Sequence, residues 1–263
     1  TIFGTIGNSA NSLSSVNAGA TGTISTFNGD IYSKDTNIVG DGTVNLNQDL
    51  IGTNLTFNAN GIVNSIADIS ATVVGTAGTI NMNGTTQNIT GNVGTINNLN
   101  IVNGTTTLNG NLNALNTNIS SNATLNSLGN ITSNVNGTTA NSGTLNMNGS
   151  SQTITGNVGN IKSLQNFNVT NGTTILNGNL NAVNTNISNG ATLNSVGNIT
   201  STVNGTAANS GNLLMSGAIQ TISNSIGNIY SLNNFTVKTG VTTANADIKA
   251  LSTNIENGAT LNL

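Results

Sequence analysis

Residues 102–143 read VNGTTTLNGNLNALNTNISSNATLNSLGNITSNVNGTTANSG, and residues 170–211 read TNGTTILNGNLNAVNTNISNGATLNSVGNITSTVNGTAANSG. The second stretch is a nearly verbatim copy of the first, 68 positions further along the chain. A fixed internal period is the sequence signature of a repeat protein, in which each unit packs mainly against its neighbours. The period therefore restricts the fold before any single residue is considered.

The copies can be counted from a glycine that follows Val or Ile at the same place in each copy. It occurs at Gly7, Gly94, Gly159 and Gly227, so the steps are 87, 65 and 68 residues. The step from 65 to 68 reflects three extra residues, which we place near Gln165–Phe167 in a loop. The sequence thus predicts one solenoid domain over residues 1–263, made of repeats at about 7–93 (degenerate), 94–158, 159–226 and 227–263 (partial).

The repeat is expected to form strands rather than helices. Asn-Gly pairs such as Asn103-Gly104 and Asn177-Gly178 recur every few residues and would interrupt a helix. Short alternating runs such as 145–147 and 199–203 lie between them, which is typical of half-buried strands. These features predict an all-β parallel β-helix, or β-solenoid, with about a dozen coils of about 22 residues. An antiparallel β-sandwich or barrel array is the rival fold.

Comparison of the copies predicts which side chains face inward. Positions that stay apolar form the predicted interior, because packed interiors accept only apolar exchanges. Charged residues enter at other positions, at Asp247, Lys249 and Glu256, which we therefore place outside. The predicted interior sets are Leu108/Leu176/Ala244, Leu112/Leu180/Ile248, Leu115/Val183/Leu251, Ile119/Ile187/Ile255 and Leu125/Leu193/Leu261.

Asparagine makes up roughly a fifth of the chain. Turns between strands need positive φ, which Asn and Gly adopt at least cost. Asn side chains at equivalent turns of stacked coils can also hydrogen-bond to one another as ladders. An AT-rich genome would enrich Asn as well, so both explanations stay open.

The composition argues against several function classes. Only 4% of the residues are charged, there are four cations and no His, and the net charge is −3. Because nucleic acid binding needs a cationic surface, we expect no nucleic acid partner. No apolar run approaches the roughly 18–20 residues of a membrane span. The absence of Cys excludes disulfides and thiolate metal sites.

Few residues here could carry catalysis. His and Cys, the commonest base and the thiol nucleophile, are absent. Four carboxylates fall within residues 30–49 and could converge as a pair for glycoside chemistry, or hold calcium around Asp35 and Asp41. Solvated loop carboxylates are the simpler interpretation. We therefore predict no enzyme, no cofactor, and no catalytic, cofactor-binding or metal-binding residue. The four carboxylates are Asp30, Asp35, Asp41 and Asp49.

Four stretches carry a family resemblance: GDIYSKDTNIVGDGTVNLN (29–47), NGTTTLNGNLNA (103–114), TNISNGATLN (185–194) and SIGNIYSLNNF (225–235). They resemble the passenger domains of Gram-negative autotransporters, in the style of rickettsial surface cell antigens and outer membrane proteins. The resemblance implies a β-helical passenger that is exported by a C-terminal outer-membrane barrel and displayed at the cell surface. No catalytic or binding motif carries it, so no functional residue can be transferred.

The function we expect is that of a non-catalytic, extracellular structural or adhesive rod or coat on the bacterial surface. The alternative is a self-assembling filament or surface-layer subunit, because solenoid ends without polar caps expose strand edges. A third hypothesis, a polysaccharide-acting enzyme, requires the aspartates of residues 30–49 to line a groove. The partners we expect are a second copy of the chain, end to end or laterally, and a host-cell receptor or glycan.

Overall fold

The structure is a computed structural model that describes all 263 residues. It contains 27 strands and no helix, so it has no helix long and apolar enough to cross a membrane. The strands are parallel and stack as a β-solenoid of about 13 turns. The predicted all-β solenoid is confirmed, and the antiparallel alternative is wrong. By its contacts the chain divides into two compact units, which we call unit 1 (Thr1–Gly129) and unit 2 (Asn130–Leu263).

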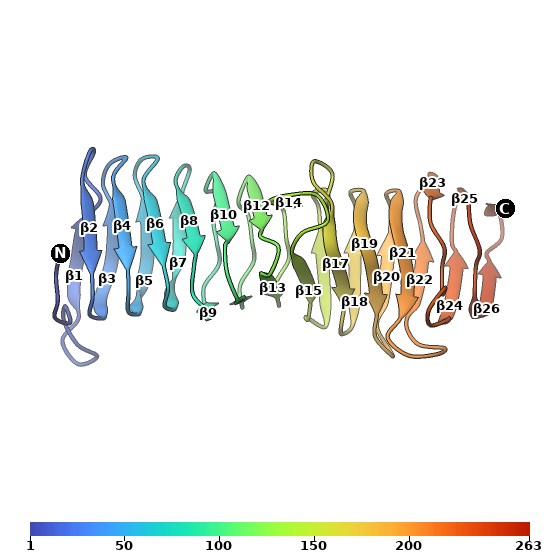
Figure 1. The fold of residues 1–263 in the computed structure, drawn as a ribbon, viewed down its shortest axis with the longest axis horizontal. Coiled ribbons are helices and arrows are strands. Elements are labelled where there is room, and N and C mark those ends of the chain that lie inside the picture. Colours follow the sequence, from blue (N-terminus) through green and yellow to red (C-terminus); the bar gives the residue numbers. More distant parts are fainter. The chain divides into compact units, whose positions relative to one another are not determined.

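Unit 1, blue to green in Figure 1, contains two parallel sheets whose neighbouring strands come from successive coils. The strands of the first sheet are β1 (Leu13–Ala18), β3 (Ile31–Ile38), β5 (Leu50–Phe57), β7 (Ile69–Gly75), β9 (Thr86–Ile89), β11 (Thr105–Leu108) and β13 (Thr124–Ser127). The strands of the second sheet are β2 (Ile24–Phe27), β4 (Thr43–Leu46), β6 (Ile62–Ser65), β8 (Thr79–Met82), β10 (Asn98–Ile101) and β12 (Asn116–Ile119).

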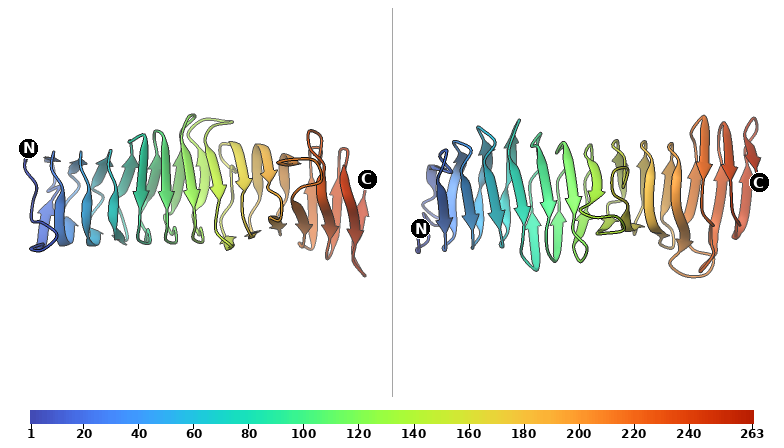
Figure 2. Two further views of the ribbon diagram at one scale, coloured as in Figure 1. Left: turned by 90° about the horizontal axis from the view of Figure 1, so that it is seen from below. Right: turned by 45° about the horizontal axis from the view of Figure 1, so that its top comes forward.

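Unit 2 repeats this plan, and Figure 2 shows its strands side by side from two further directions. It begins with β14 (Asn134–Gly137). The strands of one sheet are β15 (Thr144–Met147), β17 (Leu164–Val169), β19 (Leu180–Ile187), β21 (Ile199–Gly205), β23 (Ile219–Ile222), β25 (Val241–Ala244) and β27 (Thr260–Asn262). The strands of the other are β16 (Ser151–Ile154), β18 (Thr173–Leu176), β20 (Thr192–Ser195), β22 (Asn212–Met215), β24 (Leu232–Val237) and β26 (Ala250–Ile255).

The strand register measures the length of each coil. Thr43 pairs with Ile62, so this coil contains 19 residues, and successive coils are generally about 19 residues apart. The expected length of about 22 residues occurs in unit 2, where Thr144 pairs with Asn166. The longer coils accommodate extra residues in loops, which leaves the strand pairing intact.

The core follows the alternation of the strands. Most four-residue strands bury their second and fourth residues, so the apolar side chains form columns along the inside of each unit. The predicted interior positions Leu108, Leu176 and Ala244 are buried, as are Leu125 and Leu193. Asp247, Lys249 and Glu256 are exposed, as predicted.

One predicted interior set is wrong, and Ile255, which was also predicted inside, is 52% exposed in the last coil. Leu115 is 63% exposed, and Val183 and Leu251 are exposed as well. Val183 lies where the pairing of β19 with β21 shifts register, between Asn181 and Asn184. Such an irregularity turns one side chain out of the alternation, so an apolar residue here faces solvent.

The three extra residues of the longer coil also lie elsewhere than expected. Phe167 is fully buried in β17, and so is Leu164 at its start. Ile161 is instead 74% exposed, so the insertion lies in the segment that joins Gly159 to β17. The equivalent segment one repeat later carries the exposed residues Ile229 and Tyr230.

Turn geometry depends on glycine more than on asparagine. Asn141 and Asn209 are the only non-glycine residues with positive φ, and many glycines adopt it. The expected positive φ of Asn at turns therefore occurs at two positions alone. Many Asn residues instead lie on strands, between buried positions, where neighbouring coils are close enough for amides to meet.

Candidate functional site

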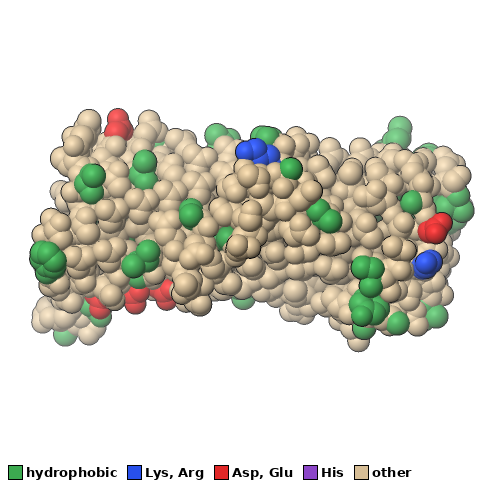
Figure 3. Space-filling model, viewed as in Figure 1, with side chains coloured by type: hydrophobic (Ala, Val, Ile, Leu, Met, Phe, Trp, Pro, Cys, Tyr) green, Lys and Arg blue, Asp and Glu red, His purple; other side chains and the backbone are tan.

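Three aspartates form a row on the surface of unit 1. The backbone N–H of Asp49 donates to Asp30 Oδ1 (3.2 Å), and that of Asp68 donates to Asp49 Oδ1 (3.0 Å). Asp68 in turn accepts from the N–H of Asn88 (2.7 Å) and from its side-chain amide (3.0 Å). Figure 3 shows acidic side chains along one edge of this unit. These carboxylates bond one coil to the next.

The other two candidate carboxylates do not join this row. Asp35 Oδ1 accepts from Asn54 Nδ2 (2.8 Å), and Asp41 Oδ1 accepts from the N–H of Asn60 (3.0 Å). No group of three or more His, Cys, Asp or Glu side chains could hold a metal ion. The aspartates of residues 30–49 are thus distributed over separate columns of the coil, and the calcium hypothesis finds no ligand set.

The second sheet of unit 1 carries a continuous ladder of side-chain amides, one from each successive strand. Each Asn donates through Nδ2 to Oδ1 of the Asn in the preceding coil, with distances of 2.9, 2.8, 2.8 and 2.9 Å. Asn45, the first, also donates to Thr26 Oγ1 (3.2 Å). We call this set the unit 1 ladder; its members are Asn45, Asn64, Asn81, Asn100 and Asn118.

The ladder explains why so few charges are needed on the surface. Strands in a sheet are about 4.8 Å apart, and a side-chain amide can both donate and accept across that distance. In a column of identical amides, each side chain therefore hydrogen-bonds to the next, whereas in a column of identical charges neighbouring side chains repel one another. The ladder also joins neighbouring coils outside the backbone hydrogen bonds, so a polar surface contributes to the stacking.

A shorter ladder lies on unit 2. Asn168 Nδ2 donates to Asn146 Oδ1 (2.7 Å), and Asn186 Nδ2 donates to Asn168 Oδ1 (2.8 Å). We call Asn146, Asn168 and Asn186 the unit 2 ladder. The next residue in register is Asn204, which has no hydrogen bond to Asn186; its Oδ1 accepts from the N–H of Ile229 (2.9 Å), as Asn136 Oδ1 accepts from that of Ile161 (3.0 Å) one repeat earlier.

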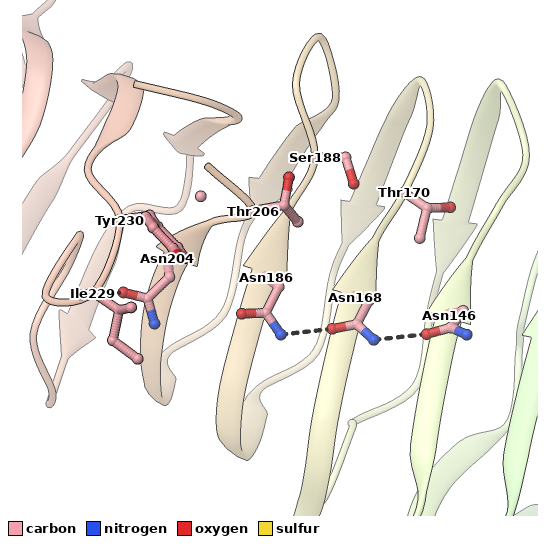
Figure 4. Close-up of a pocket in the computed structure, with 10 residues that line it drawn as sticks. Asn146, Asn168, Thr170, Asn186, Ser188, Asn204, Thr206, Ile229 and Tyr230 are labelled. Carbon is pink, nitrogen blue, oxygen red and sulfur yellow. Dashed lines mark hydrogen bonds between the residues drawn. The ribbon is translucent and has the colours of Figure 1, made fainter. Parts of the chain in front are cut away.

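The interrupted end of the unit 2 ladder lies in a groove of about 480 Å³. This volume is within the range of small-molecule sites, roughly 300–1,000 Å³. Figure 4 shows the amides along the groove, a rim of hydroxyl side chains, and an end formed by Ile229 and Tyr230. The rim consists of Thr170, Ser188 and Thr206.

The segment that ends the groove is held against β21. The N–H of Gly205 donates to the carbonyl of Tyr230 (3.0 Å), and the N–H of Gly227 donates to the carbonyl of Val203 (2.6 Å). Gly227 has φ of +70°, and a Cβ there would lie 2.1 Å from the carbonyl oxygen of Lys249. Only glycine fits this position, so the segment starts at a fixed point.

The groove is electrically neutral. None of its lining side chains is an acid or a base that is charged at neutral pH, and the polar groups are amides and hydroxyls. Ile229 and Tyr230 are 67% and 48% exposed, so their apolar surface faces the solvent side of the groove. The arrangement can hydrogen-bond and pack against a neutral ligand.

A second hollow lies on unit 1 and has a different character. It measures about 400 Å³ and is lined by Tyr32, Lys34, Gly52 and polar neighbours. Lys34 makes it cationic, and no interrupted ladder ends in it. The groove of unit 2 is therefore the better defined of these two sites.

The prediction that no residue forms a site left the groove unrecognised, although one signal was present in the copies. Tyr230 replaces Lys162 at the same place in the preceding repeat, and the chain has only two tyrosines. An aromatic residue that appears in one copy alone is a departure from the repeat. Comparisons of the chain with protein-family models, curated proteins and solved structures find no match.

Proposed function

We propose that the chain is a non-catalytic, adhesive solenoid displayed on the outside of a bacterial cell. The observation that carries the proposal is the way in which the surface uses its polar groups. Amides that would otherwise be free for chemistry are paired from coil to coil in the ladders of both units. A surface built in this way is neutral, regular and stiff, which suits display rather than turnover.

The adhesive role follows from the geometry of the coils. Each strand is fixed to its neighbours at the spacing of a sheet, so exposed side chains keep constant distances within a unit. Ligand groups that repeat at a similar spacing then meet several contacts at once, and linked contacts raise the overall affinity without new chemistry. The segments that carry Ile161 and Ile229 project apolar side chains to such a partner.

The extracellular location is supported by composition and by the resemblance of stretches such as 185–194 and 225–235 to autotransporter passengers. A surface with 4% charged residues does not rely on ion pairs, so changes in salt and pH outside a cell would affect it little. The absence of Cys leaves no thiol to oxidise there.

Surface display can be tested with antibodies against the purified chain on intact and lysed cells of the source organism. We expect equal labelling of both, and loss of the label when intact cells are treated with protease. Adhesion can be tested with beads coated with the folded chain on epithelial monolayers, with heat-unfolded chain as the control. Labelling that requires lysis would overturn surface display, and equal adhesion of both bead types would overturn the adhesive role.

A further inference from the structure

The break in the unit 2 ladder leaves two polar groups without a protein partner. Asn186 donates to Asn168, but its own Oδ1 receives no hydrogen bond. Asn204 lies 2% exposed and is oriented by the N–H of Ile229, which donates to its Oδ1. Its Nδ2 lies on the other side of the amide and has no hydrogen bond to Asn186 Oδ1. In Figure 4 the oxygen of Asn186 and the nitrogen of Asn204 face each other across the groove, with no hydrogen bond between them.

An acceptor opposite a donor defines the group that fits between them. A hydroxyl accepts from an amide N–H with its lone pairs and donates its own proton to an amide oxygen. A carboxylate, a phosphate or a metal ion can satisfy only one of the two. We propose that the groove of unit 2 binds a neutral oligosaccharide, one hydroxyl of which bridges Asn186 Oδ1 and Asn204 Nδ2 and so completes the ladder.

The walls of the groove suit the rest of a sugar. Tyr230 and Ile229 provide exposed apolar surface at the end of the ladder, where the C–H face of a sugar ring can pack. Thr170, Ser188 and Thr206 provide hydroxyls along the rim. Sites of this kind combine an apolar contact with a few placed polar groups that fix orientation.

The same features disfavour other ligands. An acidic glycan or a nucleic acid would need cations, and none lines the groove. A peptide that adds a strand would need free backbone donors at the edge it joins. The N–H of Gly205 is already bonded to the carbonyl of Tyr230, and that of Thr206 to the carbonyl of Ile187.

The proposal can be tested with the purified full chain and a panel of neutral and acidic oligosaccharides. Saturation-transfer NMR identifies binders, and side-chain amide resonances in ¹H–¹⁵N spectra locate them. We expect neutral oligosaccharides to bind with a Kd of about 0.1–1 mM, and the amide signals of Asn186 and Asn204 to shift. Acidic oligosaccharides should bind at least about tenfold more weakly.

Variants assign the binding to the groove. Tyr230→Ala should weaken it at least about tenfold, and Tyr230→Phe should keep most of it, because the ring supplies the contact. Asn186→Ala removes the acceptor and should weaken binding by a similar factor while the thermal midpoint shows that the chain still folds. Lys162→Ala, which changes the matching position of the preceding repeat, is the control and should bind like the parent chain.

The proposal is overturned if no neutral oligosaccharide binds, if binders leave both amide signals unmoved, or if Lys162→Ala weakens binding as much as Tyr230→Ala. It deepens the proposed adhesive function, yet the two can fail separately. If cells display the chain and beads coated with Tyr230→Ala adhere as well as beads coated with the parent chain, only the proposed binding site in the groove is refuted. Specific binding by a chain found only inside cells would refute surface display alone.

Discussion

The unit 1 ladder and the unit 2 ladder use the same residue at the same kind of strand position, and they differ in length and in surroundings, since a groove that ends in Ile229 and Tyr230 adjoins the unit 2 ladder. In unit 1, an amide such as Asn81 both donates to the coil before it and accepts from the coil after it. In unit 2, Asn168 does the same, whereas Asn186, the last member, donates to Asn168 and has no hydrogen bond to Asn204, whose Oδ1 accepts from the N–H of Ile229. An amide inside a ladder is paired on both sides, whereas the amide at the end of a ladder presents an unpaired oxygen to a ligand.

The comparison also shows how a repeat protein can gain a site at low cost. The ladder positions are common to many coils, so any one of them can be exposed by a change in a neighbouring loop. In the insertion after Gly159 the residue at the key place is Lys162, and its Nζ donates to the carbonyl of Thr138 (2.6 Å). In the insertion after Gly227 it is Tyr230, which lines the groove. Both insertions hold an Asn oxygen through a backbone N–H, that of Ile161 on Asn136 and that of Ile229 on Asn204, so they differ in the side chain that follows, Lys162 or Tyr230.

The largest effect is expected from Gly227→Ala, which disturbs the start of the segment that carries Ile229 and Tyr230. A side chain at positive φ costs about 1–2 kcal/mol, and the collision with the carbonyl of Lys249 adds to it. We expect the free energy of unfolding, measured in urea, to fall by about 2–4 kcal/mol, with loss of the groove. Gly190→Ala is the control, since Gly190 has φ of +76° and open space around it. Equal losses in both variants would refute the role of the collision.

Deleting one amide from each ladder tests the comparison directly. Asn81→Ala removes two hydrogen bonds and leaves Asn64 Oδ1 and Asn100 Nδ2 without their partner. Asn186→Ala removes only one. We expect losses of about 1–2 kcal/mol for Asn81→Ala and about 0.5–1 kcal/mol for Asn186→Ala, from urea unfolding. If Asn186→Ala were the more destabilising, the ladder of unit 2 would not be interrupted as described.

A third prediction concerns buried hydroxyls of the core, which lack the pairing that the surface amides have. Thr174 is fully buried, and its Oγ1 has no hydrogen-bond partner. Thr174→Val should therefore raise the free energy of unfolding by about 1 kcal/mol, because it removes an unsatisfied polar group. Thr185→Val is the matched control, since Thr185 Oγ1 is bonded to Ser201 Oγ (2.8 Å), and it should lower stability by about 1 kcal/mol. Destabilisation by both would contradict the assignment.

The smallest effect concerns the charged row of unit 1. Asp49 lies between Asp30 and Asp68, and Asn in its place keeps the acceptor oxygen that the N–H of Asp68 needs. Like charges one strand apart repel by somewhat less than about 1 kcal/mol in water, so Asp49→Asn should stabilise by about 0.5 kcal/mol.

The salt dependence of this effect separates charge from hydrogen bonding. At about 1 M salt the charges are screened and the gain from Asp49→Asn should vanish. Asn179→Asp provides the comparison in unit 2, where Asn179 has the same role between Asn157 and Asn198 (2.8 and 2.9 Å) and no charged neighbour in its row. It should change stability little at either salt concentration. A gain for Asp49→Asn that persists in high salt would disprove the repulsion.

The sequence predicted the fold well because the repeat records the same environment several times. Apolar positions such as Leu125 and Leu193 stayed apolar in every copy and are buried. The same reasoning failed for Leu115 and Val183. A position that stays apolar in every copy is not always buried, because an apolar residue can also persist on the outside of an irregular strand. Coil length was close to the expected value but shorter, because one repeat of 68 residues, from β15 to β22, spans seven strands and therefore about three and a half coils.

Much less of the candidate site than of the fold could be predicted from the sequence. The abundance of Asn indicated ladders, but the sequence placed them at turns, and their strand positions depend on the register between coils. Asn204 and Tyr230 are separated by a loop and a strand, and nothing in the order of residues shows that the Ile229 backbone captures one amide. The sequence left open whether the aspartates of residues 30–49 converge; Asp30 and Asp49 instead join Asp68 in a column that extends along the coils.

The sequence by itself determined that this protein is a stack of parallel coils with an apolar inside and a neutral amide surface, because periodic alternation specifies which side of a strand is buried. The tertiary structure alone decided which amides meet, since a hydrogen bond between coils depends on a register that differs from coil to coil with each insertion. It decided in the same way that the segment after Gly227 ends one ladder. Pairing across coils is a property of the stack, and no single coil contains it.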